Sequence, residues 1–278
     1  MGFLGPCSRE GSAYSKRPTP RRPCTLGALL TPTETLSDIL EAVREVPGWM
    51  TDEQARRLWA SAAQVPEGGR IVEIGSFRGR SLIVLAKSAG PLSELVSIDP
   101  HAGTDRGPLG AAGQEATASA DHAAYRENLE AAGVLDGVRH VRAFSSEALH
   151  EVTEPIDLLY IDGAHQRRAA LADIQDWGAK VREGGTMLIH DSFSSVGVTT
   201  AIATSLLYSR SWRYQGRSGS LAEYRRARCT AREARQSTVE QLAALPWFLR
   251  NVGVKVLQAI GLGRWTKVLG HEGAHPPF

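Results

Sequence analysis

The segment from Arg70 to Ser81, RIVEIGSFRGRS, constrains the fold more than any other part of this chain. An apolar Ile/Val run leads into a turn that contains Gly75 and Gly79, and a helical pattern starts at Ser81. Glycine has no Cβ, so the backbone N–H groups of such a turn can approach a ligand closely. Glu73 adds a carboxylate beside the same turn. The segment predicts a buried strand, a turn and a helix, with either a ligand crevice or simple packing at the turn.

Strand and helix patterns alternate along the rest of the chain. The expected strands are Ile71–Ile74, Leu95–Ile98, Val138–Ala143, Ile156–Ile161, Thr186–Ile189, Trp212–Arg217 and Ser220–Tyr224. The expected helices are Thr35–Val46, Thr51–Gln64, Ser81–Ala89, Tyr125–Ala132, Ser146–Val152, Arg167–Val181 and Thr199–Tyr208. Strands joined by helical crossovers predict an α/β protein with a doubly wound, mostly parallel, seven-stranded sheet. Ser218-Gly219 predicts an antiparallel terminal hairpin.

Composition narrows the class of protein. With 278 residues and 42% hydrophobic content, the chain can bury one substantial α/β core. The run of about 18 apolar residues that a membrane span needs is not found. The three cysteines, Cys7, Cys24 and Cys229, are scattered, which predicts reduced thiols in a cytoplasmic protein. A twin-arginine export signal at Arg21-Arg22 is disfavoured, because the apolar run after it is short and contains Gly27.

Charge divides the chain into three parts. Residues 1–23 carry five Lys/Arg against one Glu, and residues 225–278 carry nine against three, so the middle is net acidic. An acidic body argues against nucleic-acid binding. We predict a disordered basic leader at residues 1–33, a folded domain at 34–228 and a basic, amphipathic, helical extension at 229–278.

Apolar residues recur at helical spacing in the C-terminal extension, with basic residues and tryptophans among them. The apolar positions are Leu242, Leu245, Leu249, Val252, Val256 and Ile260. A segment of this kind can lie on an anionic membrane surface as a peripheral contact. Docking on the folded domain or on the partner of a homodimer is favoured over the membrane, because three glycines interrupt any long helix.

Polar residues follow every strand of the parallel set. They are Glu73, Asp99, Ser145-Ser146-Glu147, Asp162-Gly163-Ala164-His165 and His190-Asp191-Ser192. The carboxyl ends of parallel strands meet at one edge of a doubly wound sheet, where ligands bind. Packing alone explains this pattern poorly, so we expect a binding site at that edge.

These residues resemble class I S-adenosylmethionine-dependent methyltransferases, in which the first strand carries Glu/Asp-x-Gly-x-x-x-Gly and the second ends in an acid. The resemblance covers Pro47 to Arg226. The segments Tyr160–His165 and Ile189–Asp191 resemble the small-molecule O-methyltransferase branch that includes macrocin-type sugar methyltransferases and cephalosporin-hydroxylase-like proteins. The resemblance implies S-adenosylmethionine as the cofactor and is silent on the substrate.

The resemblance also implies roles for particular residues at the cofactor. Asp99 would accept hydrogen bonds from both ribose hydroxyls, although it can also be a helix N-cap before Pro100. Glu73 and Gly75 would line the methionine part, and Gly79 would permit close approach of the helix. The whole implied cofactor set is Glu73, Gly75, Ser76, Gly79, Ser81, Asp99, Ser145 and Asp162.

Methyl transfer to an alcohol needs the hydroxyl proton removed, by a base or with the help of a divalent cation. Asp162, Asp191 and His165 resemble a metal site for Mg²⁺. His190 stands where several relatives have a second acid, which favours Mn²⁺ or no metal. His190 and Asp191 are the expected catalytic residues, with His190 as a mostly neutral base or, alternatively, a hydrogen-bonded core histidine.

The predicted function is O-methylation of a hydroxyl on a small-molecule or saccharide acceptor. The long insertion His101–Asp121 is expected to close over that acceptor. A non-catalytic methyltransferase-fold protein that binds the cofactor or a partner is the main alternative. A nicotinamide oxidoreductase is disfavoured, because the turn after the first strand lacks the Gly-x-Gly-x-x-Gly fingerprint.

Overall fold

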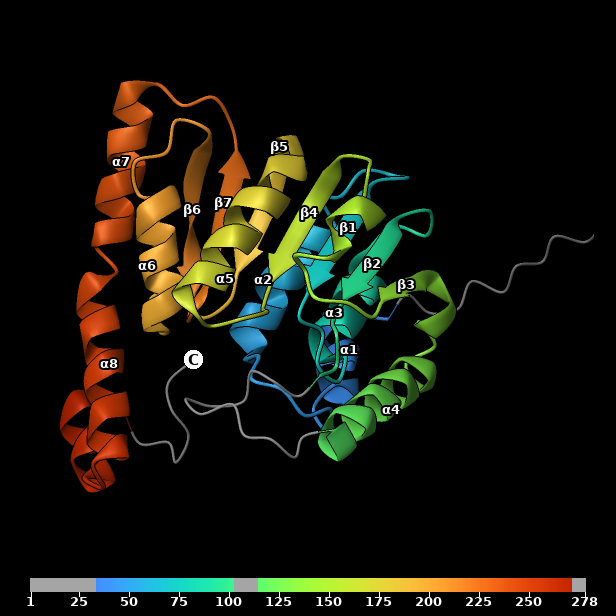
Figure 1. Cartoon of the computed structure of the whole chain (residues 1–278), viewed down its shortest axis with the longest axis horizontal. Helices are drawn as coiled ribbons and strands as arrows, with labels where there is room; N and C mark the ends of the chain where they lie inside the picture. The colour runs from blue at the N-terminus through green and yellow to red at the C-terminus, as the bar shows by residue number, and fades with distance from the viewer. Residues whose placement is uncertain (1–33, 103–114, 272–278) are drawn as a thin grey trace, which may run out of the picture. The chain divides into compact units, whose positions relative to one another are not determined.

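The computed structural model describes residues 34–102 and 115–271 (Figure 1). The predicted leader at 1–33, residues 103–114 of the predicted acceptor lid and the last seven residues lie outside this part. Glu34 is the first residue of the compact unit that contains all described residues. A domain boundary at 228/229 therefore stays a prediction.

Seven strands form one sheet in the order β3-β2-β1-β4-β5-β7-β6. The first five are parallel, β7 is antiparallel to β5, and β6 pairs antiparallel with β7. The predicted fold class, including the terminal hairpin, is confirmed. The strands are β1 Arg70–Ile74, β2 Glu94–Ile98, β3 Val138–Val141, β4 Ile156–Ile161, β5 Val181–Ile189, β6 Trp212–Ser218 and β7 Leu221–Arg226.

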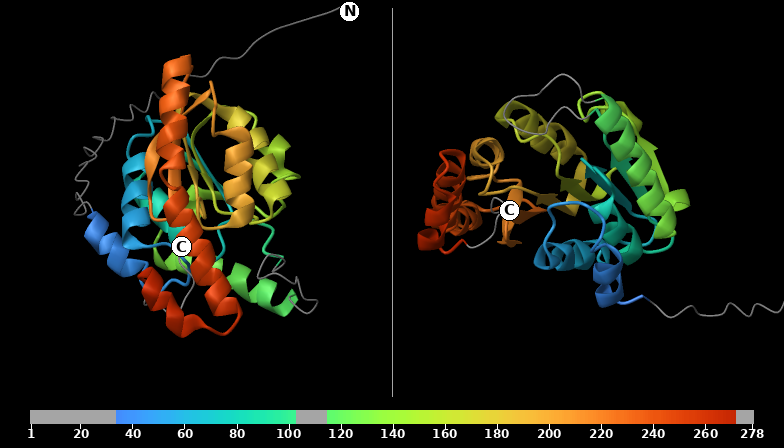
Figure 2. Two further views of the ribbon diagram at one scale, coloured as in Figure 1. Left: turned by 90° about the vertical axis from the view of Figure 1, so that its left-hand side faces the viewer. Right: turned by 90° about the horizontal axis from the view of Figure 1, so that it is seen from below.

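Side chains of each central strand alternate between two apolar layers, as the pleat requires. Ile71 of β1 packs in one layer with residues of the four N-terminal helices, whereas Val72 and Ile74 pack in the other. Figures 1 and 2 show helices on both sides of the sheet. The first layer contains α1 Leu36–Ala42, α2 Asp52–Ala62, α3 Arg80–Ser88 and α4 Glu115–Ala131, and the second contains α5 Arg167–Ala172 and α6 Val196–Ser205.

Three predicted helices differ from the structure. The helix expected from Tyr125 begins at Glu115, so α4 takes up part of the predicted lid. The helix expected at Ser146–Val152 is only a 3₁₀ turn, η2 Ala148–Glu151. The helix expected over Arg167–Val181 is α-helical only to Ala172. It continues as a π-turn, η3 Asp173–Trp177, and a short 3₁₀ turn, η4 Gly178–Lys180, before β5.

The C-terminal extension forms α7 Ala231–Leu242, α8 Leu245–Ala259 and the 3₁₀ segment η5 Gly263–Leu269. Pro246 occupies the first turn of α8, where the missing N–H costs nothing. Asn251 and Val254 are fully buried, so α8 docks on the domain. Leu249, Val256 and other apolar side chains of the extension remain exposed. Among the described helices none is long and apolar enough to cross a membrane.

Candidate active site

The turn after β1 depends on its two glycines. Gly75 has φ +85°, and a Cβ there would lie 2.3 Å from the backbone oxygen of Asp162. Gly79 also has φ +85°, and a Cβ there would lie 2.3 Å from Leu129 Cδ1 on α4. Glycine adopts such a φ without steric cost. The turn can therefore pass close to the end of β4 and to α4 at once.

Glu73 lies beneath the turn and is fully buried. Its Oε1 accepts a hydrogen bond of 2.5 Å from Ser81 Oγ, in the first turn of α3. Burial raises the pKa of Glu73 to about 8, against the lowering effect of the serine hydroxyls. Glu73 is thus mostly protonated at neutral pH, and it anchors α3 rather than facing solvent.

This carboxyl group gives a testable dependence of stability on pH. Because the folded-state pKa is raised above its ordinary value near 4.3, the folded state holds a proton that the unfolded state releases. The stabilising contribution is complete below about pH 4 and is lost as pH rises to about 8. Glu73→Gln removes this contribution. Between pH 5 and 7, the unfolding free energy of the wild type should fall by about 2–3 kcal/mol more than that of Glu73→Gln. This corresponds to about 1.4 kcal/mol per pH unit.

Urea unfolding of the wild type and Glu73→Gln at pH 5, 6 and 7 measures this difference. Glu154→Gln is the matched control, because Glu154 is exposed. Parallel stability curves for the wild type and Glu73→Gln would show that Glu73 is already ionised when folded.

Asp99 follows the end of β2 and accepts hydrogen bonds from two backbone N–H groups. Its Oδ2 accepts a hydrogen bond of 2.8 Å from the N–H of Phe77 in the glycine turn, and its Oδ1 accepts one of 2.7 Å from the N–H of His101. His101 has φ +45°, so no helix begins directly after Asp99 and Asp99 does not cap one there. Each carboxylate oxygen has a further lone pair, so the group can still accept hydrogen bonds from a vicinal diol.

The three predicted serines make contacts inside the protein. Ser76 Oγ lies 2.7 Å from Ser97 Oγ, so this side chain points toward β2 rather than into the crevice. Ser145 Oγ donates a 2.5 Å hydrogen bond to Asp173. Burial raises the pKa of Asp173 to about 6. Asp173 was not predicted as a site residue, because its sequence segment has the pattern of an ordinary helix.

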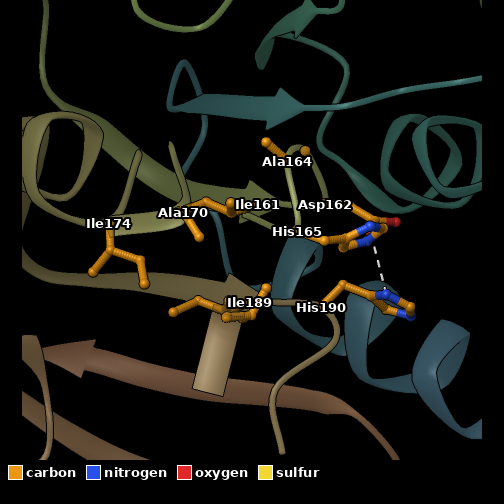
Figure 3. A pocket seen from close by; sticks show the side chains of 10 residues that line it. Ile161, Asp162, Ala164, His165, Ala170, Ile174, Ile189 and His190 are labelled. Atoms are coloured by element: carbon orange, nitrogen blue, oxygen red, sulfur yellow. Dashed lines mark ion pairs between the residues drawn. The ribbon is translucent and has the colours of Figure 1, made fainter. Parts of the chain in front are cut away.

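The residues after β4 and β5 form a tight cluster. His165 Nε2 lies 2.6 Å from Asp191 Oδ2. His190 Nδ1 lies 3.1 Å from Asp162 Oδ1 (Figure 3). His190 Nδ1 is also 3.6 Å from Asp191 Oδ2. Tyr160, a residue that the sequence analysis did not single out, donates a 2.9 Å hydrogen bond to Asp162 Oδ2. The structure thus brings together all four residues predicted for catalysis or metal binding.

The prediction of a mostly neutral His190 is wrong in this arrangement. Burial alone would lower the pKa of His190, but the adjacent carboxylates of Asp162 and Asp191 outweigh it and raise the pKa to about 10. Hydrogen bonds from His165 and His190 hold the pKa of Asp191 well below its ordinary value, against the effect of burial. His190 is therefore a buried imidazolium that pairs with two carboxylates.

The loop that carries Asp191 is strained and is held by α8. Asp191 and Phe193 have φ +56° and +57°, which non-glycine residues rarely adopt. Asn251 donates a 3.3 Å hydrogen bond to the backbone oxygen of Phe193, and Lys255 Nζ donates a 3.0 Å hydrogen bond to that of Ser194. The C-terminal extension thus supports the position of the candidate catalytic carboxylate.

Asp162, His165 and Asp191 also form a donor set that fits a divalent cation. One ligand atom from each lies within 4.8 Å of the others. Two carboxylates and one imidazole suit Mn²⁺ better than Mg²⁺, which prefers oxygen ligands alone. The neighbouring imidazolium of His190 opposes a cation. The small cavity in Figure 3 lies beside this cluster, and at about 10 Å³ it has room for about one water molecule.

The central part of the chain is similar to a known protein family. A family model described as a methyltransferase domain matches residues 72–192. This segment is similar to methyltransferase domains. The match begins within β1 and ends just after Asp191, so it includes Glu73, Asp99 and the cluster after β4 and β5. It also argues against the nicotinamide oxidoreductase alternative.

Solved structures share the fold of the methyltransferase domain. Cofactor-bound Rv0187 from MTB is 21% identical, with a TM-score of 0.51 over 70% of this chain and 90% of that one. The O-methyltransferase NovP is 17% identical, with a TM-score of 0.52 over 69% and 88%. The methyltransferase PaMTH1 from Podospora anserina, solved with S-adenosylhomocysteine, is 17% identical, with a TM-score of 0.52 over 70% and 88%. At these identities the likeness shows a common fold.

Proposed function

We propose that this methyltransferase transfers the methyl group of S-adenosylmethionine to a hydroxyl of a small molecule. More specifically, we propose that the acceptor molecule carries a sugar. The observation that carries the proposal is the pair of His165 Nε2 and Asp191 Oδ2, 2.6 Å apart at the same edge as Asp99. The side chain of His165 is half exposed, so an acceptor can reach it. NovP, which shares the fold, is itself described as an O-methyltransferase.

The cofactor would lie along the ends of β1, β2 and β4. The Asp99 carboxylate would accept hydrogen bonds from the ribose hydroxyls, and the turn around Gly75 would support the methionine part. Glu73 and Ser81 hold α3 beneath that turn, and Ser76 holds it to β2. Ser145, linked to Asp173, fixes the segment after β3, where the resemblance implies an adenine contact.

The reaction is an in-line displacement. The acceptor oxygen forms a bond to the methyl carbon as the sulfur–methyl bond breaks, and the electron pair of that bond neutralises the sulfonium. Asp191 orients His165 through Nε2, and the other ring nitrogen of His165 takes the acceptor proton. His190, as an imidazolium, holds the Asp162 and Asp191 carboxylates in place.

Metal assistance is the second form of this proposal. Asp162, His165 and Asp191 would hold Mn²⁺ or Mg²⁺, and a bound cation lowers the pKa of a coordinated hydroxyl. His165 and Asp191 thus take part in both mechanisms, with and without a metal ion. Cytoplasmic location, a homodimer and peripheral membrane contact through the exposed apolar residues of the C-terminal extension stay predictions.

Transfer of a labelled methyl group from S-adenosylmethionine to a panel of sugars, glycosides and aromatic diols tests the proposal. We expect acceptor-dependent formation of S-adenosylhomocysteine by the full chain. Activity that persists in a chelator supports the His165–Asp191 pair, and activity that needs added Mn²⁺ or Mg²⁺ supports metal assistance. Cofactor binding without transfer to any acceptor would favour the non-catalytic alternative.

A further inference from the structure

Three histidines from separate elements meet beside β2, outside the cluster just described. His101 follows the end of β2, His122 lies on α4, and His140 lies on β3. One ring nitrogen of each lies within 4.8 Å of the others. The centroid of the His101 ring is 4.9 Å from that of His122 and 5.1 Å from that of His140. The proposed methyl transfer uses none of these three side chains.

Two of these rings have a buried nitrogen that makes no hydrogen bond. His101 is 4% exposed, and its Nε2 has no hydrogen-bond partner among the described residues. His140 Nε2 is also buried and also has no hydrogen-bond partner among the described residues. A buried polar atom without a partner costs about 1–3 kcal/mol, so such atoms call for an explanation.

The opposite nitrogens of the same rings face polar groups. His140 Nδ1 lies 3.2 Å from Ser97 Oγ, and His101 Nδ1 lies 3.8 Å from Asp99 Oδ1. Metal-binding histidines commonly have one nitrogen on the ion and the other directed at a carboxylate or hydroxyl. In His101 and His140 the Nδ1 atoms face such groups, which leaves the Nε2 atoms for an ion.

We propose that His101, His122 and His140 bind a divalent transition-metal ion, with zinc as the best match. This site is independent of the proposed methyl transfer. Three imidazoles suit Zn²⁺, Ni²⁺ or Cu²⁺, whereas Mg²⁺ and Ca²⁺ need oxygen ligands. At Zn–N distances of about 2.0–2.1 Å, tetrahedral ligand nitrogens lie about 3.3 Å apart, so the rings must close by up to about 1.5 Å.

The surroundings keep the three rings ready to bind an ion. Burial lowers the pKa of His101 and His122, and it lowers that of His140 to about 4, so their lone pairs are available at neutral pH. Among the described residues, the charged groups near the cluster are Asp99, Asp121, Arg126 and Arg142. The negative charges of the two aspartates thus offset the positive charges of the two arginines. The bound ion would join the end of β2 to α4 and β3.

Cobalt binding tests the site, because four-coordinate Co²⁺ absorbs visible light and zinc displaces it. Full-length protein stripped with a chelator is titrated with Co²⁺ and then with Zn²⁺. We expect a visible band in the wild type and at least a tenfold loss of Co²⁺ affinity in His122→Ala, which places a good helix former on α4. His140→Gln is a second variant with the same expected loss, and circular dichroism checks that each variant is folded.

Two controls locate the ion. His150→Ala removes an exposed histidine, and His165→Ala removes a ligand of the other cluster. Both are expected to bind Co²⁺ through the three histidines as the wild type does. The proposal is overturned if the stripped wild type gives no band, or if His122→Ala and His140→Gln keep it. It is equally overturned if His165→Ala alone loses the band.

Discussion

Asp191→Asn is expected to lower kcat about a thousandfold while changing the Kd for S-adenosylhomocysteine less than about threefold. Asp191 lies 2.6 Å from His165 and 3.6 Å from His190, so its charge orients the proposed base and balances the imidazolium. Proton transfer by a positioned group contributes about 10²–10⁴ in rate. Asparagine tolerates the φ of +56° at this position, so the loop should keep its shape.

Initial rates with an acceptor found by screening, together with calorimetric Kd values, measure both quantities. Asp176→Asn is the matched control, since Asp176 is exposed in the π-turn. An Asp191→Asn enzyme that retains more than a tenth of wild-type kcat would remove Asp191 from the proposed chemistry. Equal losses in kcat and in cofactor affinity would instead assign it to cofactor binding.

Asp99→Asn is expected to weaken S-adenosylhomocysteine binding at least about a hundredfold. The carboxylate accepts hydrogen bonds from the N–H groups of Phe77 and His101, and it is the proposed acceptor for the ribose hydroxyls. Hydrogen bonds to a charged group contribute about 1.5–3 kcal/mol each. The asparagine amide can serve one of the two N–H groups as an acceptor, but its NH₂ faces the other as a second donor.

Calorimetric titration with S-adenosylhomocysteine measures the effect. Asp136→Asn, at an exposed aspartate before β3, should bind as the wild type does. Urea midpoints show whether Asp99→Asn acts by unfolding the turn. If a stably folded Asp99→Asn protein binds within threefold of the wild type, Asp99 holds only the backbone and the ribose assignment fails.

The strands were predictable because their apolar runs are short and bounded by turn residues, and Ser218-Gly219 marked the hairpin. The start of α4 was missed because the glycine- and alanine-rich insertion before Tyr125 has no apolar periodicity. The π-turn at Asp173–Trp177 was missed for a different reason. A sequence pattern of period 3.6 does not show where one extra residue enters a helix.

The residues of the candidate site could be predicted from the sequence. The protonation state of His190 could not. The ends of β4 and β5 were identified from the sequence, but the charge of His190 depends on the pairing of Ile161 with Ile189. That register places Asp162 next to His190. The three-histidine cluster was missed because His101, His122 and His140 are far apart in the chain and match no metal motif.

A crystal structure of the full chain with S-adenosylhomocysteine would show where the ribose and the sulfur of the cofactor product lie. We expect both ribose hydroxyls within hydrogen-bond distance of the Asp99 carboxylate, and the sulfur on the side of Asp162 and Asp191. A nucleoside bound away from Asp99, or a chain that does not bind S-adenosylhomocysteine at millimolar concentration, would contradict this expectation.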